Sequence, residues 1–373
     1  MKNYTMIRDR KTNVILEKAL AEKPLTKNDI IHLLSVEDQR EMQKLFEVAK
    51  LLRARYFNDS IYLYGFLYFS TFCLNECTFC INRVSNLSVL RYRKDKNAII
   101  DACRYLKSSG IHCIDLTMGE DPLFYQNDKG VSYLREIVRG IKKEADLPLM
   151  ISPGALSKSA LADLAGDGVE WYACYQECHN PSLFQKLRPG QDYGYRLNIK
   201  YFAKELGLLV EEGILTGVGE KLEDIADSFI EMGRLGAQQV RVMRFIPCTD
   251  VPLKVRYGHS RKSELIAIGI LRLLFPDRLI PASLDIDGIK TLQKRLEAGA
   301  NVITSLVPPF MGFSGVAQPS LDINEGNRSV EKVLPILKKC GLEPASLEDY
   351  ILWIKSEKKK MRATGHLCQE VCG

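Results

Sequence analysis

The clearest pattern in this chain is an alternation of short apolar runs with amphipathic stretches, which begins at residue 61. The apolar runs are rich in β-branched and aromatic residues, as buried strands are, and the stretches between them place apolar residues at helical spacing. Eight runs are predicted to be strands: Ile61–Phe69, His112–Thr117, Pro148–Ser152, Glu170–Tyr175, Leu209–Thr216, Gln239–Ile246, Leu279–Leu284 and Asn301–Leu306. The helices predicted to follow them cover residues 95–109, 131–145, 158–166, 196–207, 222–235, 262–275, 288–298 and 328–341.

Successive strand–helix units predict an α/β fold whose parallel sheet closes into a complete (βα)8 barrel. An open, doubly wound sheet is the alternative that the same alternation allows. The N-terminal residues have a helical pattern, with helices that begin near Thr26 and Ser35. We therefore expect an N-terminal helical layer (1–57), a barrel (58–345) and a peripheral helical or flexible tail (346–373).

The composition is that of an ordinary globular protein, with 46% hydrophobic residues, 26% charged residues and a formal net charge of +6. The densest basic run, Lys355–Lys360, is typical of a solvated helix end and does not indicate a nucleic-acid partner. The N-terminus lacks the apolar segment of a signal peptide, and the longest apolar run, Ile61–Phe69, is far shorter than the ~20 residues that cross a membrane. We expect a cytoplasmic protein without a membrane or nucleic-acid partner.

Three of the 11 cysteines, Cys73, Cys77 and Cys80, are spaced for metal chemistry directly after the first predicted strand. Iron–sulfur clusters are usually held by four thiolates, so three neighbouring thiolates leave one iron of a cubane open. The Cys-x3-Cys-x2-Cys spacing resembles the signature of radical S-adenosylmethionine (SAM) enzymes, in which the open iron of a 4Fe–4S cluster binds SAM. Zinc is the alternative, but it normally takes a fourth Cys or His nearby. Two further cysteines that lie close in sequence, Cys368 and Cys372, are in the tail and either hold a metal or repair cluster or are idle.

Charged residues also occur inside or at the end of three other predicted strands, at Asp115, Arg241 and Asp285. A charge inside an apolar strand is costly unless it is paired, and the active site of a (βα)8 barrel lies at the C-terminal ends of its strands. Two carboxylates and one guanidinium complement an amino acid with two ammonium groups and one carboxylate, such as lysine or ornithine. The alternative is a structural ion-pair network among the three side chains.

The strand ends resemble one family in particular, the methylornithine synthases, which catalyse the first step of pyrrolysine biosynthesis. The resemblance spans roughly residues 30–345 and is carried by Tyr68–Cys73, Asp115–Pro122, Met150–Gly154, Tyr175–Glu177, Glu212–Gly219, Val240–Met243 and Ile280–Asp285. It implies a radical SAM isomerase on a complete barrel, related to biotin synthase and to the maturase of iron–iron hydrogenase. In such an enzyme the reduced cluster cleaves SAM to methionine and a 5′-deoxyadenosyl radical, which takes a hydrogen atom from lysine. The carbon skeleton then fragments and rejoins as the branched product, 3-methylornithine.

The same resemblance implies roles for individual residues. The three cysteines would hold the cluster, and the amino acid would be held by Asp115, Arg241, Ser283 and Asp285. Arg241 is assigned to the substrate carboxylate and the two aspartates to its ammonium groups. The residues assigned to SAM are Phe79, Gly119, Glu120, Ser152, Glu177, Arg188, Arg196 and Val218.

Within the SAM set, Gly119 and Glu120 match the motif that binds the SAM amino group, and Val218 would line the adenine. Arg188 and Arg196 are alternatives for the SAM carboxylate, which arginine grips through two hydrogen bonds. No catalytic group is expected beyond the SAM-derived radical, and a reductant such as flavodoxin or ferredoxin would reduce the cluster. Arg244 departs from the family pattern because it places an extra charge beside the site.

Two rival functions remain open at this point. Another radical SAM enzyme of the hydrogenase-maturase or biotin-synthase type could use the same barrel, although the strand-end cysteines that biotin synthase needs for its second cluster are missing. A non-enzymatic iron–sulfur or zinc-binding module would share the cysteines and would cleave no SAM.

Overall fold

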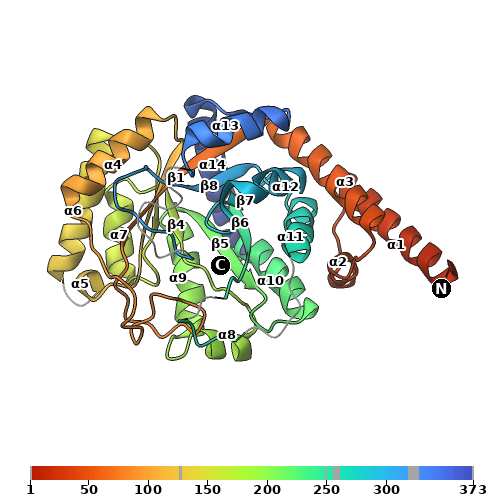
Figure 1. Ribbon diagram of the computed structural model, residues 1–373, viewed down its shortest axis with the longest axis horizontal. Helices are drawn as coiled ribbons and strands as arrows, with labels where there is room; N and C mark the ends of the chain where they lie inside the picture. The colour runs from red at the N-terminus through yellow and green to blue at the C-terminus, as the bar shows by residue number, and fades with distance from the viewer. Residues whose placement is uncertain (1, 126–127, 248–249, 255–260, 318–326, 372–373) are drawn as a thin grey trace.

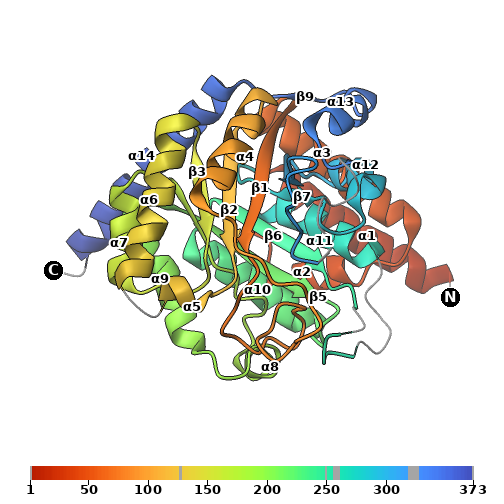
Figure 2. The same cartoon turned by 60° about the vertical axis from the view of Figure 1, so that its left-hand side comes forward.

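The computed structural model describes residues 2–125, 128–247, 250–254, 261–317 and 327–371. A barrel of parallel strands lies at its centre, with helices packed around the outside (Figures 1 and 2). The strands are β1 (Ser60–Ser70), β2 (Cys113–Met118), β3 (Leu149–Ser152), β4 (Trp171–Ala173), β5 (Leu209–Thr216), β6 (Gln239–Arg244), β7 (Pro281–Ser283) and β8 (Val302–Leu306).

The order of the strands shows that the sheet closes on itself. Neighbours follow the sequence β6-β5-β4-β3-β2-β1-β8-β7, and each pair in this order is parallel. The two ends of the order meet where Gln239 bridges to Leu279, and the Val240 backbone N–H donates to Leu279 O at 3.0 Å. The predicted (βα)8 barrel is therefore confirmed, and an open sheet is excluded.

The helices that cover the barrel match most of the predicted ranges. They are α4 (Lys96–Ser108), α5 (Pro122–Tyr125), α6 (Asp128–Glu144), α7 (Lys158–Gly166), α8 (Pro181–Leu187), α9 (Tyr193–Glu205), α10 (Leu222–Leu235), α11 (Arg261–Leu274), η1 (Gly288–Thr291), α12 (Leu292–Glu297) and α13 (Val330–Lys339). The short helices α5 and α8 were not predicted, because they contain too few residues to show helical periodicity. The sequence does contain a start signal for α8, since the Asn180 side chain caps Ser182 N and Pro181 occupies the first turn.

The predicted strands over Glu170–Tyr175 and Leu279–Leu284 are wrong in length, since the structure retains only three residues of each. Beyond Ala173 and Ser283 the chain turns into the loops that carry the site. Their conformations include left-handed residues at Glu177 (φ 65°) and Asp287 (φ 63°), which a continuing strand cannot accommodate.

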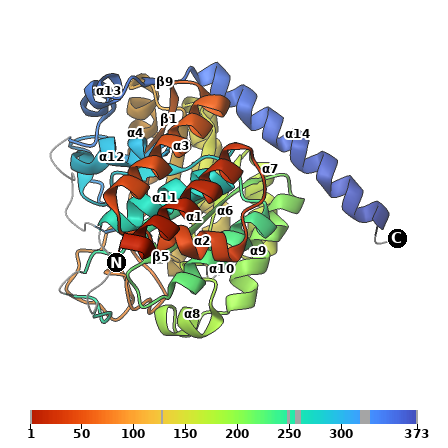
Figure 3. The ribbon, with the colours of Figure 1, turned by 90° about the vertical axis from the view of Figure 1, so that its right-hand side faces the viewer.

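Two helical segments lie outside the barrel. The N-terminal layer of α1 (Lys2–Leu20), α2 (Lys27–Leu34) and α3 (Gln39–Phe57) packs beside α10 and α11 (Figure 3). At the other end of the chain, β9 (Glu343–Pro344) pairs with β1 and leads into α14 (Leu347–Val371).

The first turns of α14 close the N-terminal end of the barrel. Tyr350 is fully buried, and its hydroxyl lies 2.5 Å from that of Tyr64. Trp353 stacks on Trp171, the first residue of β4, with ring centroids 5.8 Å apart. The tail was expected to be peripheral, but this part of it is packed. Its aromatic residues cover the N-terminal end of the barrel, and the opposite end remains for the site. Among the described residues, no helix has the length and apolar character needed to cross a membrane.

Candidate active site

The loop that follows β1 carries the three cysteines at the C-terminal end of the barrel, the end at which α5 and α8 also lie (Figure 2). Each sulfur accepts a hydrogen bond from an N–H group, a contact that stabilises thiolate charge. Asn75 N lies 3.5 Å from Cys73 Sγ, and Asn82 N lies 3.3 Å from Cys80 Sγ. Cys77 Sγ accepts from the side chains of Gln191 at 3.1 Å and Arg188 at 3.4 Å.

This donor set fits a cluster better than it fits zinc. Burial raises the pKa of Cys73 and raises that of Cys80 to about 12, and the neighbouring thiols add to both shifts. Buried thiols of this kind become thiolates only beside a cationic centre. Within the described ranges, no three His, Cys, Asp or Glu side chains lie close enough to hold a single metal ion. A cubane needs a wider arrangement, because its three thiolates bind three different irons.

Two buried ion pairs lie next to the cysteines. Arg188 donates to Glu177 at 2.8 Å, and Arg196 donates to Glu120 at 3.0 Å. Burial, the largest single effect, acts to raise the pKa of Glu120, but Arg196, hydrogen bonds from Asn75 and Ala155, and Arg188 together outweigh it and the net shift is downward. For Glu177 burial prevails and the pKa is raised, despite the adjacent Arg188. Both arginines predicted for SAM therefore lie at the cluster side of the barrel, already oriented by carboxylates.

Two glycines make room for this arrangement. A Cβ at Gly119 would lie 2.2 Å from the Phe72 carbonyl oxygen, so the loop after β2 can approach the cysteine loop only with glycine there. Gly154 has a left-handed φ of +89°, and a Cβ on it would lie 2.3 Å from Glu120 Cγ. Both positions therefore allow Glu120 to reach Arg196.

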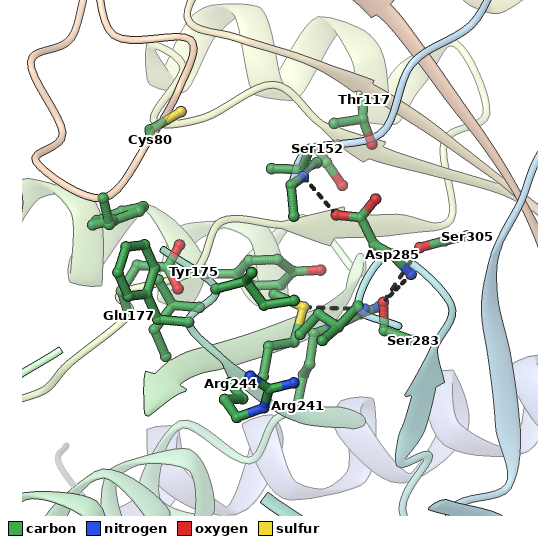
Figure 4. A pocket seen from close by; sticks show the side chains of 18 of the residues that line it. Cys80, Thr117, Ser152, Tyr175, Glu177, Arg241, Arg244, Ser283, Asp285 and Ser305 are labelled. Atoms are coloured by element: carbon green, nitrogen blue, oxygen red, sulfur yellow. Dashed lines mark hydrogen bonds between the residues drawn. The ribbon is translucent and has the colours of Figure 1, made fainter. Parts of the chain in front are cut away.

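A cavity opens between the strand ends and contains about 930 Å³ of space, counting its mouth. Its walls include all four residues predicted for the amino acid, which are Asp115, Arg241, Ser283 and Asp285. Figure 4 shows Ser283, Asp285 and Ser305 together on one side of the cavity and Cys80 at some distance from them. The substrate set and the cysteine loop therefore face a common space.

The SAM set is distributed between this cavity and the layer behind it. Phe79, Ser152 and Glu177 line the cavity. The remaining predicted residues, Gly119, Glu120, Arg188, Arg196 and Val218, are not among the residues that line it. Ser152 donates to Asp115 Oδ1 at 2.7 Å, which places it closer to the predicted substrate carboxylates than its assignment to SAM implied.

Arg241 and Asp285, which line the cavity, pair with residues outside its lining and not with each other. Arg241 donates to Glu211 at 2.6 Å, and Asp285 accepts from Arg328 at 3.0 Å. Among the described residues, Asp115 accepts hydroxyl hydrogen bonds from Thr117 at 2.9 Å and from Ser152, and makes no ion pair. An ion-pair network among Asp115, Arg241 and Asp285 alone is therefore not what the structure contains.

Within the part of the chain that the structure describes, Asp115 is an acidic group that makes no ion pair. Burial, and next the nearby Glu211 carboxylate, raise its pKa to about 6, against the two hydroxyl hydrogen bonds and Arg241. A carboxylate in this condition gains most from an ammonium group placed beside it.

A pH dependence follows from this shift. We expect kcat/KM for the amino acid to fall ~tenfold per pH unit below about 6, because the protonated carboxyl no longer attracts an ammonium group. The folded-state pKa lies above the ordinary value of 3.8, so protonation of Asp115 stabilises the fold as the pH falls through 6. Loss of turnover near pH 5 without a lower unfolding temperature would thus report on binding. The Asp115→Asn variant should lose this limb of the profile; if it retains the limb, another group is responsible.

Comparisons with known proteins agree with this geometry. Residues 67–230 match the model of the radical SAM superfamily. The 3-methylornithine synthase of Methanosarcina acetivorans is 42% identical, over 90% of this chain and 94% of that protein. The enzyme of Methanosarcina barkeri is 40% identical, with the same coverage of 90% and 94%. A crystal structure of methylornithine synthase superimposes with a TM-score of 0.86 at 40% identity, and the match covers 91% of this chain and 99% of that one.

This chain belongs to the methylornithine synthase family. As a radical SAM enzyme it uses a 4Fe–4S cluster and SAM, and the zinc-module alternative is excluded. The FeFe hydrogenase maturase subunit HydE of Thermotoga maritima is also similar, at 30% identity over 78% of this chain and 82% of that protein. The methylornithine synthases match over more of the chain and at higher identity.

The sequence analysis did not identify several residues of this methylornithine synthase's active site. Glu211 lies within an apolar strand, so its buried charge was a signal that could have been used. Arg328 lies in a loop far from any predicted strand and had no such signal. Arg244, noted as an extra charge, pairs with Asp287 at 3.1 Å. Cys372 and the side chain of Cys368 lie outside the part of the chain that the structure describes.

Proposed function

We propose that this protein converts L-lysine to 3-methylornithine, the first step of pyrrolysine biosynthesis. The observation that carries the proposal is a cavity beside the cysteine loop whose charged groups complement lysine, in a chain of this family. SAM bound to the reduced cluster supplies the radical that removes a hydrogen atom from the substrate.

The residues of the cavity bind and orient the amino acid. Nη1 of Arg241 donates to Thr304 and Nε to Glu211, and among the described residues Nη2 has no hydrogen-bonding partner. This free edge of the guanidinium points to binding of the substrate carboxylate. Asp115 takes one ammonium group, because its carboxylate makes no ion pair with any described residue.

Asp285 receives the second ammonium group. Its two carboxylate oxygens already accept from Arg328 and from Ala317 N, at 3.0 and 2.8 Å. Each oxygen keeps a lone pair that can accept a further hydrogen bond. The Ser283 hydroxyl lies 3.4 Å from that of Ser305 and can donate or accept a hydrogen bond next to Asp285. The two aspartates thus hold the ends of an extended diamino acid.

The remaining walls exclude water from the radical. Phe66, Phe79, Leu215 and Phe245 contribute apolar surface to the cavity. This apolar surface reduces the contact of a substrate radical with water, which limits side reactions. A small reductant protein of the flavodoxin or ferredoxin class delivers the electron that the cluster needs, and a thiol-dependent site of this kind suits the reducing cytoplasm.

Anaerobic reconstitution tests the proposal. Protein loaded with iron and sulfide, reduced with dithionite and supplied with SAM and L-lysine should form 3-methylornithine, detected by mass spectrometry after derivatisation. It should also form 5′-deoxyadenosine at a rate that rises when lysine is added. Formation of 5′-deoxyadenosine that does not depend on lysine, with no branched product, would contradict the lysine assignment and favour another radical SAM reaction.

A further inference from the structure

The charged groups that line the cavity form pairs with one exception. Arg241 pairs with Glu211, Asp285 with Arg328, Arg244 with Asp287 and Glu177 with Arg188, at distances of 2.6 to 3.1 Å. Asp115, the remaining lining charge, makes no ion pair within the described part of the chain. Counted together with their partners in the surrounding layer, the lining charges comprise four arginines and five carboxylates, a formal net charge of −1.

Glu211 accounts for the excess negative charge of the chamber. It is fully buried, and its second oxygen accepts from the Tyr175 hydroxyl at 2.8 Å. Without its charge, the positive Arg241 would offset the negative Asp115 and the chamber would be neutral. Its neighbour Glu212 is equally buried but lies on the other face of β5, where it pairs with Lys200. Successive residues of a strand point to opposite faces, so only Glu211 contributes to the chamber.

We propose that Glu211 sets the charge of the amino acid that this enzyme accepts, by leaving the chamber one negative charge in excess. Lysine carries two ammonium groups and one carboxylate, so its net charge of +1 brings the chamber to neutrality. An amino acid of net charge zero leaves the buried Asp115 carboxylate uncompensated, which costs up to several kcal/mol. The specificity-determining feature is therefore the sum of the buried charges, and it acts in addition to any single contact with the substrate. This inference rests on the proposed lysine substrate.

Binding of two ligands of similar shape tests it. L-2-aminoheptanoate carries a methyl group where lysine has its ε-ammonium, so the two differ mainly in charge. Dissociation constants are measured by anaerobic calorimetry on cluster-loaded, SAM-bound protein. The wild type should bind lysine at least ~100-fold more tightly than the analogue. The Glu211→Gln variant should reduce this ratio at least ~tenfold, with weaker binding of lysine and tighter binding of the analogue.

Matched variants separate charge from position. Glu211→Asp keeps the charge and should keep the wild-type ratio. Glu212→Gln removes an equally buried charge from the opposite face of the same strand and should leave the ratio unchanged, whatever it does to the unfolding temperature. If Glu211→Gln weakens both ligands equally, Glu211 merely holds Arg241 in place and the proposal is wrong.

A second variant keeps the test available if Glu211→Gln does not fold. Arg328→Gln removes a positive charge from the opposite wall and should increase the preference for lysine over the analogue. An unchanged ratio in a folded Arg328→Gln protein would also overturn the proposal. Failure of the lysine assignment is separately visible, because the wild type would then form no 3-methylornithine in the reconstitution assay.

Discussion

Replacing Cys77 with serine is expected to abolish formation of both 5′-deoxyadenosine and 3-methylornithine. Cys77 is one of the three thiolates assigned to the cluster, and it accepts hydrogen bonds from Gln191 and Arg188. The variant keeps two of the three thiolates assigned to the cubane, and a hydroxyl is a poor substitute for a thiolate at iron. Iron and sulfide analysis, the visible absorbance of the reconstituted protein and the spectrum of the reduced cluster with SAM would measure the loss.

A suitable control for this variant is Cys340→Ser. Cys340 is a partly exposed thiol that follows α13, far along the chain from the β1 loop. It should retain wild-type iron content and turnover. If Cys77→Ser instead kept its full iron content and cleaved SAM at the wild-type rate, the assignment of the three cysteines to the cluster would be wrong.

The Asp285→Asn variant is expected to lose both lysine turnover and stability. Asp285 was first selected as a partner for a substrate ammonium group, but the structure also pairs it with Arg328, which is fully buried. Removal of one member of a buried ion pair typically costs ~3–5 kcal/mol, because the remaining charge is left uncompensated. Asparagine also cannot form an ion pair with the substrate ammonium group, so KM for lysine should rise ~100-fold or more. Steady-state kinetics and denaturant unfolding would measure the two effects separately.

The double variant Asp285→Asn with Arg328→Met distinguishes the two roles. It removes the stranded guanidinium, so most of the lost unfolding free energy should return, since apolar replacement of a buried pair is often neutral. Lysine turnover should not return, because the ammonium partner is still missing. Recovery of turnover together with stability would show that Asp285 acts only through the fold.

Much of the architecture could be predicted because it depends on local pattern. β5 was predicted to its terminal residues, Leu209 and Thr216, because apolar residues dominate both of its ends although Glu211 and Glu212 lie inside it. β4 and β7 were predicted too long, because the apolar pattern continues past the residues that pair with neighbouring strands. The tail 346–373 was expected to be peripheral, because the packing partner of α14 is visible only once the barrel has formed.

The sequence by itself determined the chemistry of this protein. Cys73, Cys77 and Cys80 are close in sequence, and the spacing of ligands within one short loop can be recognised without a fold. Strand-end charges such as Asp115 and Arg241 could be selected because any charge in an apolar strand requires a reason. The tertiary structure alone decided which charges are neutralised: Glu211 faces Arg241 and Arg328 faces Asp285, across 30 and 43 residues of chain. Coulomb interactions depend on distance in space and on burial, and neither quantity can be read from the order of residues.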